Sequence, residues 1–585
     1  MYGFHNKYLH INMTDRSFRE VPLDDQTLSN YLGGKGLATH LLLEHLPPGT
    51  DPLSAENIII FTTGPAAATK IPAASRYGVF TKSPQTGIYC ESYSGGHVAP
   101  IIKKTGYDAI LITGKSDTPL YLHIHPNGVT FHDARHIWGM DSYATEDAIN
   151  AEINIKDVQS VVIGPAGENL IAFSCISNNY WRCAGRGGVG AVLGSKKIKG
   201  IAFTGDKEAE VADPALLNNF ITDLINRGKE NAGVSAYRKL GTPMMVNVLN
   251  DSDAFPTRYW QDGRYSDYKK INADTMQAKF EVKPKACHRC FIGCGKLSTV
   301  REGKHQGLTV EGPEYETIYA FGGLCCINSI EDILYVNDLC DRWGIDTITA
   351  GNLAAFAIEA KKRGKLDNAP DYGDTEGIVQ FLSDIVSRTN TGEIFANGIR
   401  KAASRLHLEE LAIHVKGMEP AGYDPRVLKG MGLAYATSDR GACHLRATFY
   451  KPELSGMIEP DALEGKAELF IDFEDRLTLF DTFIFCRFFR DLIGWQELST
   501  AIKALTGITM DKNKLQQLAS RITDNTRRFN LREGVTAKDD TLPLRLMREP
   551  IGDKKQHLIT EEELHYLVQD YYKLRGWNKE GCPPL

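Results

Sequence analysis

The sequence predicts an α+β protein, in which strands predominate in the first third of the chain and helices in the rest. Short apolar runs that stop at turn residues predict the strands; Ile58–Phe61, for example, is followed by Gly64-Pro65. Two further runs flank Pro126-Asn127-Gly128, which is a strong hairpin signal. Beyond the charged stretch Asp206–Glu210, apolar residues recur at helical spacing. The order of these patterns therefore places a β-rich part before a helical part.

The chain has 585 residues, which is more than one hydrophobic core usually supports. We expect an N-terminal β-rich domain over residues 1–207 and two mostly helical domains over residues 208–418 and 419–585. Ser329 begins a helix signature, because its side chain can cap a run that carries an acidic residue three positions later. A second helix is predicted from Thr347 towards Gly364.

Composition excludes several classes of function. Hydrophobic residues make up 42% of the chain and charged residues 24%, with a net charge of -6, so neither nucleic acid nor an anionic membrane is an expected partner. No leader peptide and no apolar run long enough for membrane insertion is recognised. The 12 cysteines are scattered rather than clustered in a short framework. We therefore expect a cytoplasmic enzyme with reduced thiols.

A cysteine trio is the clearest chemical motif. Cys287, Cys290 and Cys294 form C-x2-C-x3-C, and Cys486 lies far downstream. Three thiolates on one tight loop can face a common point, and such spacing holds a soft metal centre, either a [4Fe–4S] cluster or a zinc ion. The spacing alone leaves both alternatives open.

Charged residues form further motifs. Glu316 closes a run of three carboxylates and precedes an apolar stretch, so we expect it to be buried with a raised pKa, as suits a general acid or base. His444 lies between Arg440 and Arg446, whose charges would lower its pKa. The segment from Arg182 to Gly188 is rich in arginine and glycine and resembles a phosphate cradle, although it matches neither a dinucleotide fingerprint nor a P-loop.

Together these motifs resemble the tungsten-containing aldehyde:ferredoxin oxidoreductase family, over nearly the whole chain from Gly33 to about Pro550. The resemblance implies a tungsten ion held by the dithiolenes of two pyranopterins, possible Mg²⁺ between the pterin phosphates, and one [4Fe–4S] cluster. It implies that the N-terminal β-sheet domain cups the bis-pterin cofactor. It also implies that the cluster ligands are Cys287, Cys290, Cys294 and Cys486.

The resemblance carries over to individual residues. Glu316 and His444 match the pair that lines the substrate pocket and acts in catalysis. Arg440 and Arg446 would flank the active site. The remaining pterin contacts are expected at Arg76, Gly95, Arg182, Cys183, Gly185, Arg186, Asp341, Ile345, Asp346, Asp481 and Phe485. Capping of a helix is the alternative role for Asp346.

Some positions depart from the family pattern. Tyr93 stands where an asparagine is usual, which weakens the case for a magnesium or phosphate contact there. Tyr335 stands where some members have an iron-binding glutamate, and residues 308–406 contain no histidine, so any oligomer is expected to lack an iron bridge. Cys325 and Cys326 are unusual beside the pocket segment; packing is the favoured interpretation, and an approach to the metal is the alternative.

The implied activity is the oxidation of an aldehyde to a carboxylic acid with water as the oxygen source. Electrons would leave through the cluster to ferredoxin or to a small iron–sulfur subunit, because no flavin or nicotinamide motif is present. Two alternatives remain at this point. One is a reductive tungsten subunit of the benzoyl-CoA reductase type, and the other is a zinc-stabilised scaffold protein without redox chemistry.

Overall fold

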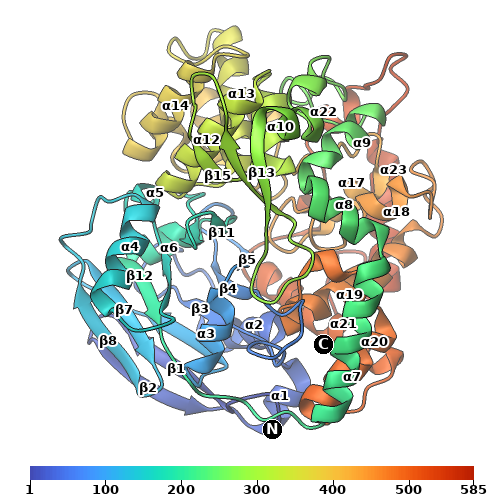
Figure 1. Cartoon of the computed structure of the whole chain (residues 1–585). Helices are drawn as coiled ribbons and strands as arrows, with labels where there is room; N and C mark the ends of the chain where they lie inside the picture. Colours follow the sequence, from blue (N-terminus) through green and yellow to red (C-terminus); the bar gives the residue numbers. More distant parts are fainter. Residues whose placement is uncertain (585) are drawn as a thin grey trace.

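The computed structural model describes residues 1–584 and has the predicted α+β architecture. Two β-sheets built from the N-terminal region lie together, and a largely helical C-terminal region covers them from above and from one side (Figure 1). The prediction from apolar patterns, that strands predominate early in the chain and helices later, is therefore confirmed. The boundaries proposed at 207/208 and 418/419 stay predictions.

The first sheet has six strands in the order β2-β1-β6-β3-β4-β5. Its pairs are antiparallel except for β1 and β6, which are parallel. The strands are β1 (Lys7–Asn12), β2 (Ser17–Pro22), β3 (Ile59–Thr62), β4 (Tyr77–Lys82), β5 (Tyr89–Ser94) and β6 (Ala109–Thr113).

The second sheet also has six strands, in the order β11-β10-β9-β12-β7-β8. The predicted hairpin is present, with His125 opposite Gly128 across a tight turn. The strands are β7 (Leu120–His125), β8 (Gly128–Asp133), β9 (Gln159–Val162), β10 (Ile176–Asn178), β11 (Arg182–Ala184) and β12 (Ile198–Phe203).

The period of two along each strand explains how the layers stack. In β3, Ile59 and Phe61 point to one face of the sheet, where they meet Leu122 and Ile201 of the second sheet. Ile60 points to the other face and belongs to a cluster formed with C-terminal helices. Because both faces are covered, every residue of β3 is buried.

Helices of the N-terminal region fill the remaining faces. Ile149 of α4 packs on Tyr121 and Val162, which cover the outer side of the second sheet. Leu41 of α2 packs between the first sheet and the C-terminal helices. These helices are α1 (Asp25–Tyr31), α2 (Gly34–His45), α3 (Val98–Lys104), α4 (Ser142–Ile153), α5 (Pro165–Glu168) and α6 (Val189–Ser195).

The middle of the chain begins the helical part. The predicted helices are confirmed: Ser329 caps α12 by accepting a hydrogen bond from the Asp332 N–H, and α13 begins at Thr347. The helices are α7 (Pro214–Glu230), α8 (Ala232–Leu240), α9 (Met245–Asp251), α10 (Ala273–Lys279), α11 (Tyr315–Thr317), α12 (Ile330–Trp343), α13 (Thr347–Lys362), α14 (Thr375–Ser387), α15 (Gly392–Phe395) and α16 (Ile399–Leu406).

The last part of the chain packs against both the sheets and the middle helices. Its longest helix, α21, contributes Leu515 and Ile522 to the cluster below the first sheet, which ties the end of the chain to its beginning. The helices are α17 (Lys429–Thr437), α18 (Tyr450–Leu454), α19 (Lys466–Phe483), α20 (Trp495–Thr506), α21 (Lys512–Arg532), α22 (Leu544–Arg548) and α23 (Glu561–Leu574).

A third, three-stranded sheet carries the cysteine trio. Strands β13 (Phe280–Lys285) and β14 (Gly295–Val300) are antiparallel, and β15 (Thr309–Glu311) extends the sheet. The connection between β13 and β14 hangs from the helical part down towards the N-terminal sheets (Figure 1). Among residues 1–584, no helix has the length and apolarity needed to cross a bilayer.

Candidate active site

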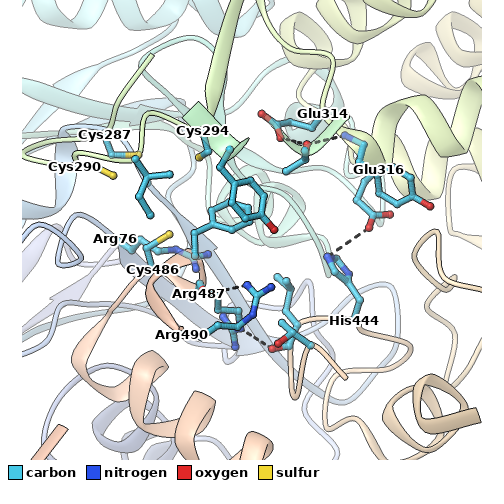
Figure 2. A pocket seen from close by; sticks show the side chains of 18 of the residues that line it. Arg76, Cys287, Cys290, Cys294, Glu314, Glu316, His444, Cys486, Arg487 and Arg490 are labelled. Carbon is cyan, nitrogen blue, oxygen red and sulfur yellow. Dashed lines mark hydrogen bonds and ion pairs between the residues drawn. The ribbon is translucent and has the colours of Figure 1, made fainter. Parts of the chain in front are cut away.

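A cavity of about 280 Å³ lies where the cysteine loop, the N-terminal sheets and the C-terminal helices meet. Nine of the residues predicted from the sequence line this one cavity, although they come from all parts of the chain (Figure 2). They are Arg76, Gly95, Arg182, Cys287, Cys290, Cys294, Glu316, His444 and Cys486.

The four predicted cluster ligands are brought together at one end of the cavity (Figure 2). Within the loop, the Cys290 N–H donates to the Cys287 carbonyl oxygen over 3.1 Å, which closes a turn. Cys486 follows the end of α19, and its N–H donates to the Ala73 carbonyl oxygen over 2.9 Å, which ties the distant cysteine to the N-terminal region. Tertiary structure thus supplies the fourth thiol to the trio.

Gly95 is needed where it stands. A Cβ atom at this position would lie 2.9 Å from Sγ of Cys287, closer than such atoms approach one another in proteins. The absence of a side chain lets the strand end of β5 pass directly against the cysteine loop. Glycine is therefore required at position 95 because the predicted cluster ligand Cys287 lies directly against it.

Positive charge surrounds the thiols. Burial alone lowers the pKa of Arg182, but the neighbouring Cys287 and Glu311 reverse this and raise it above the usual value. The guanidinium of Arg182 forms an ion pair with Glu311. Burial raises the pKa of Cys486, and Arg76 acts in the opposite direction. Arginines beside thiolates favour an anionic metal–sulfur centre, so the donor set fits an iron–sulfur cluster.

The thiols are not gathered around one point. Among residues 1–584, no group of three or more His, Cys, Asp or Glu side chains has the geometry for a single metal ion. In a [4Fe–4S] cluster each thiolate binds a different iron atom, so the four sulfur atoms stand further apart than around one zinc ion.

Glu316 and His444 face each other across the cavity wall (Figure 2). Oε1 of Glu316 lies 3.6 Å from Nε2 of His444, just beyond hydrogen-bonding distance. Oε2 of Glu316 accepts a hydrogen bond of 3.0 Å from the Gly422 N–H. Oε1 of Glu316 and Nδ1 of His444 have no hydrogen-bond partner among the described residues, so both can act on a bound molecule.

Local structure holds Glu316 in place. It lies in the short helix α11, which continues directly into a π-helical segment, η3 (Ile318–Leu324). Every residue of η3 is buried, which anchors the turn that carries the carboxylate. Wide π-helical turns are frequent at functional sites because they redirect side chains. Tyr319 of this segment donates a hydrogen bond of 2.9 Å to the Pro420 carbonyl oxygen and so joins the segment to the loop that holds Gly422.

The pKa values of the pair move as the sequence predicted. Burial raises the pKa of Glu316 to about 7, an effect that the hydrogen bond from Gly422 opposes. Burial, followed by the charges of Arg186 and Arg440, lowers the pKa of His444 well below its usual value. Near neutral pH the histidine is therefore uncharged, and the carboxyl group is close to half protonated.

Two tyrosines continue the wall beyond His444. The ring of Tyr423 stacks on the His444 ring with a centroid distance of 5.6 Å. The ring of Tyr450 stacks on Tyr423 at 4.1 Å with an interplanar angle of 12°. Both tyrosines line the cavity, which gives it a flat aromatic side.

The predicted pterin-loop arginine Arg186 is buried and neutralised. Its Nε donates to Oδ2 of Asp346 over 3.0 Å, and its other nitrogens donate to the carbonyl oxygens of Ala442 and Glu419. Asp346 also caps α13 by accepting hydrogen bonds from the N–H groups of Ile348 and Thr349. The capping interpretation of Asp346 is therefore confirmed, and the ion pair with Arg186 adds to it.

A second buried network surrounds Asp481. Oδ1 accepts a hydrogen bond of 2.8 Å from Arg487, and Oδ2 accepts one of 3.0 Å from Arg446. Burial by itself raises the pKa of Asp481, but these two guanidinium groups outweigh it and hold the pKa below its usual value. Nε and Nη2 of Arg446 and Nε of Arg440 have no partner among the described residues. Buried donors of this kind fit the anionic phosphate groups of a pterin cofactor.

The other predicted cofactor contacts lie near these networks without lining the cavity. Cys183 is close to Asp341, whose pKa is raised by burial and by that thiol. Phe485 is fully buried against C-terminal helices. Gly185 and Ile345 lie next to Arg186 and Asp346 in the sequence. Cys325 lies in the main core, Cys326 packs against that core, and neither lines the cavity.

Several residues that line the cavity were not predicted from the sequence. Arg487 and Arg490 follow Cys486 in the run F-C-R-F-F-R, so their cationic character next to a ligand was the available signal. Tyr423 and Tyr450 had no signal in the sequence. Glu419 was not predicted as a site residue, yet it is buried, its carbonyl oxygen accepts a hydrogen bond from Arg186, and burial raises its pKa to about 7.

Comparison with protein-family models supports the geometry. Residues 8–205 match the model described as "Aldehyde ferredoxin oxidoreductase, N-terminal domain". Residues 219–585 match "Aldehyde ferredoxin oxidoreductase, domains 2 & 3". The two matches together cover nearly the whole chain.

Individual relatives agree over their full length. The chain is 37% identical to a "Tungsten-containing aldehyde ferredoxin oxidoreductase" of Pyrococcus abyssi and 36% identical to the protein so named in Pyrococcus furiosus, covering 100% of this chain and 98% of each relative. Its fold matches the solved "Active site complex BamBC of Benzoyl Coenzyme A reductase in complex with 1,5 Dienoyl-CoA", with a TM-score of 0.86, 24% identity, and coverage of 100% of this chain and 96% of that one.

Proposed function

Because this chain belongs to the aldehyde ferredoxin oxidoreductase family and is an enzyme of that family, we propose that it oxidises an aldehyde to a carboxylic acid in a tungsten-dependent reaction. Electrons then pass through a [4Fe–4S] cluster to ferredoxin or to a small iron–sulfur protein. The observation that carries the proposal is the shared cavity, in which Glu316 and His444 face the space that the four cysteines close at one end.

The residues that would hold the cofactors fit them. Cys287, Cys290, Cys294 and Cys486 would bind the cluster, and the unpartnered nitrogens of Arg440 and Arg446 would meet pterin phosphates. When bound, the tungsten pyranopterin supplies the two-electron chemistry, and the cluster takes the electrons singly. A magnesium ion between the phosphates stays an expectation from the family resemblance.

The chain's own residues manage the protons. Oxidation of an aldehyde with water yields a carboxylic acid, two electrons and two protons. Ionised Glu316 can accept a proton from water through Oε1, which has no other partner. Neutral His444 can donate a hydrogen bond to the carbonyl oxygen of the aldehyde and so stabilise the negative charge that develops there. Each residue thus has an atom without a hydrogen-bond partner in the described chain, which is what an interaction with water or the aldehyde requires.

The surface beside the cysteine loop favours an acidic electron acceptor. Arg289 lies between two of the cysteines and is exposed, and His97 packs edge to face on His288 with a centroid distance of 6.1 Å. The Arg238 side chain donates a hydrogen bond of 3.0 Å to the Phe291 carbonyl oxygen, so it adds a second exposed guanidinium to this surface. Positive charge at this place would steer a negatively charged protein towards the cluster.

The alternatives have less support. A thiol of Cys325 or Cys326 close to the metal would favour the reductive, benzoyl-CoA reductase type of reaction, but neither residue lines the cavity. Sγ of Cys325 donates to the Gly351 carbonyl oxygen over 3.3 Å, as expected of a packing residue. A zinc-stabilised scaffold does not account for the buried arginine networks or for the Glu316–His444 pair.

Metal analysis and an aldehyde panel test the proposal together. We expect about one tungsten and four irons per chain in anoxically purified protein, because one bis-pterin centre and one [4Fe–4S] cluster are implied. The same preparation should reduce a viologen dye with at least one aldehyde. Full tungsten and iron loading without any aldehyde-dependent dye reduction would overturn the oxidation proposal, and zinc in place of both metals would support the scaffold.

A further inference from the structure

One buried cation in the cavity takes no part in the network around Asp481. Arg490 lines the cavity, and only 3% of it is exposed. Its Nη1 donates to the Arg487 carbonyl oxygen over 3.1 Å, whereas its Nε is buried and has no hydrogen-bond partner among the described residues. A buried guanidinium with a free N–H group is costly unless an acceptor reaches it.

No carboxylate in the described part of the chain neutralises Arg490. The adjacent Asp491 instead forms its ion pair with Lys451 on the outside of the protein. The groups that face Arg490 are the hydroxyls of Tyr450 and Tyr237. Burial lowers the pKa of Arg490, but these hydroxyls and Asp491 outweigh it, so the side chain stays charged. Nε of Arg490 is therefore left without an acceptor among the described residues, and a bound molecule could supply one.

Arg490 is separated from the reactive pair by the aromatic wall. In Figure 2 it lies below Arg487, on the side of the cavity away from Glu316. Tyr423 stacks on His444, Tyr450 stacks on Tyr423, and Tyr450 lies near Arg490. A flat molecule lying along this wall can present one end to Glu316 and His444 and the other end to Arg490.

We propose that the aldehyde substrate carries a carboxylate at the end remote from its aldehyde group, and that Arg490 binds this carboxylate. The inference rests on the proposed function and deepens it by naming a substrate class. The planar guanidinium suits a carboxylate, and the tyrosine wall suits an aromatic or otherwise flat body between the two functional groups. Arg490 is thus assigned a role in specificity and none in the chemical step.

The test compares 4-formylbenzoate with benzaldehyde on the holoenzyme. These aldehydes differ only in the remote carboxylate. We expect kcat/KM to be about 10- to 100-fold higher for 4-formylbenzoate, the size expected for a hydrogen bond to a charged group. Arg490→Met should lower the ratio of the two kcat/KM values by that factor, and Arg490→Lys should retain part of it. Equal kcat/KM values in the unaltered enzyme would overturn the inference.

A binding measurement separates this inference from the proposed reaction. Calorimetric titration of the holoenzyme should show that terephthalate binds more tightly than benzoate, and that Arg490→Met removes the difference. This result stands even if no aldehyde is oxidised. Lys451→Met is the matched control, because it removes a nearby cation that does not line the cavity. In this variant the ratio of the kcat/KM values for 4-formylbenzoate and benzaldehyde should not change. Iron content and the spectrum of the reduced cluster must stay constant in Arg490→Met. If the iron content or the cluster spectrum changes while the ratio of the kcat/KM values does not, Arg490 stabilises the cluster instead of binding the substrate, and the inference fails.

Discussion

Nε2 of His444 lies 3.6 Å from Oε1 of Glu316, although the two residues belong to segments that are far apart in the sequence. Both residues line the cavity that the four cysteines close at one end. The carboxyl group of Glu316, with a pKa of about 7, can take up or release a proton near neutral pH, while the imidazole of His444 stays neutral. This relationship makes Glu316 the first residue to change.

Replacing Glu316 by Gln should lower kcat by about 10²- to 10⁴-fold, the range typical of a lost general base. The amide keeps the size of the side chain and can still accept the hydrogen bond from the Gly422 N–H. Steady-state kinetics with a viologen dye would measure the loss. Tungsten and iron contents should not change; if both metals are lost with the activity, the residue has a structural role.

The pH dependence follows from the raised pKa of the same residue. A general base must be ionised, so kcat/KM should rise as the pH increases through about 7 and level off above it. The pKa of His444 is well below its usual value, so it stays neutral and adds no second limb near neutral pH. A pH profile of kcat/KM checks this. Glu316→Gln should remove the rise, and an unchanged inflection in that variant would show that another group titrates.

Replacing Asp481 by Asn should destabilise the native state by about 3–5 kcal/mol, because buried Arg487 would lose its counterion and buried Arg446 would keep only Glu91. The folded-state pKa of Asp481 lies below its usual value of 3.8, so its contribution is present above that pH and is lost as the pH falls through the folded-state pKa. The urea midpoint measures the effect. Asp491→Asn, which breaks a pair on the surface, should cost less than about 1 kcal/mol.

Replacing Gly95 by Ala should reduce iron binding. The added Cβ atom would lie 2.9 Å from Sγ of Cys287, and a sulfur atom that binds a cluster cannot move aside freely. Iron content per chain and the visible absorption of the cluster measure this. Gly233→Ala is a suitable control, since its Cβ would approach only the Asn231 side chain, at 3.1 Å. Full iron loading in Gly95→Ala would show that the loop adjusts.

Reversing the charge of Arg289 should weaken the reaction with an acidic electron acceptor. We expect Arg289→Glu to raise the KM for ferredoxin at low salt, and the effect should shrink as added salt screens the charges. The rate with a viologen dye and the iron content serve as internal checks that the cluster is intact. Lys401→Glu, on the distant exposed face of α16, should leave the KM unchanged. An equal change in both variants would exclude a specific docking role for Arg289.

Local patterns predicted most of the fold. Short apolar runs bounded by turn residues located β3 and the β7–β8 hairpin, and Ser329 located the start of α12, because turns and helix caps depend on neighbours in the sequence. Arg440 and Arg446 were expected to lower the pKa of His444; burial contributes most, and the arginines that add to it are Arg186, Arg440 and Arg487. Burial depends on distant segments and has no local signature.

The sequence by itself determined the class of fold, the cysteine trio with its distant fourth member, and the identity of Glu316 and His444 as a candidate pair. Only the tertiary structure decided which charges are neutralised. Asp481 lies between two arginines, whereas Arg490 has no carboxylate partner in the described chain, and both belong to one short segment. The reason is physical: the free energy of a buried charge is set by the groups that folding brings within a few ångströms of it.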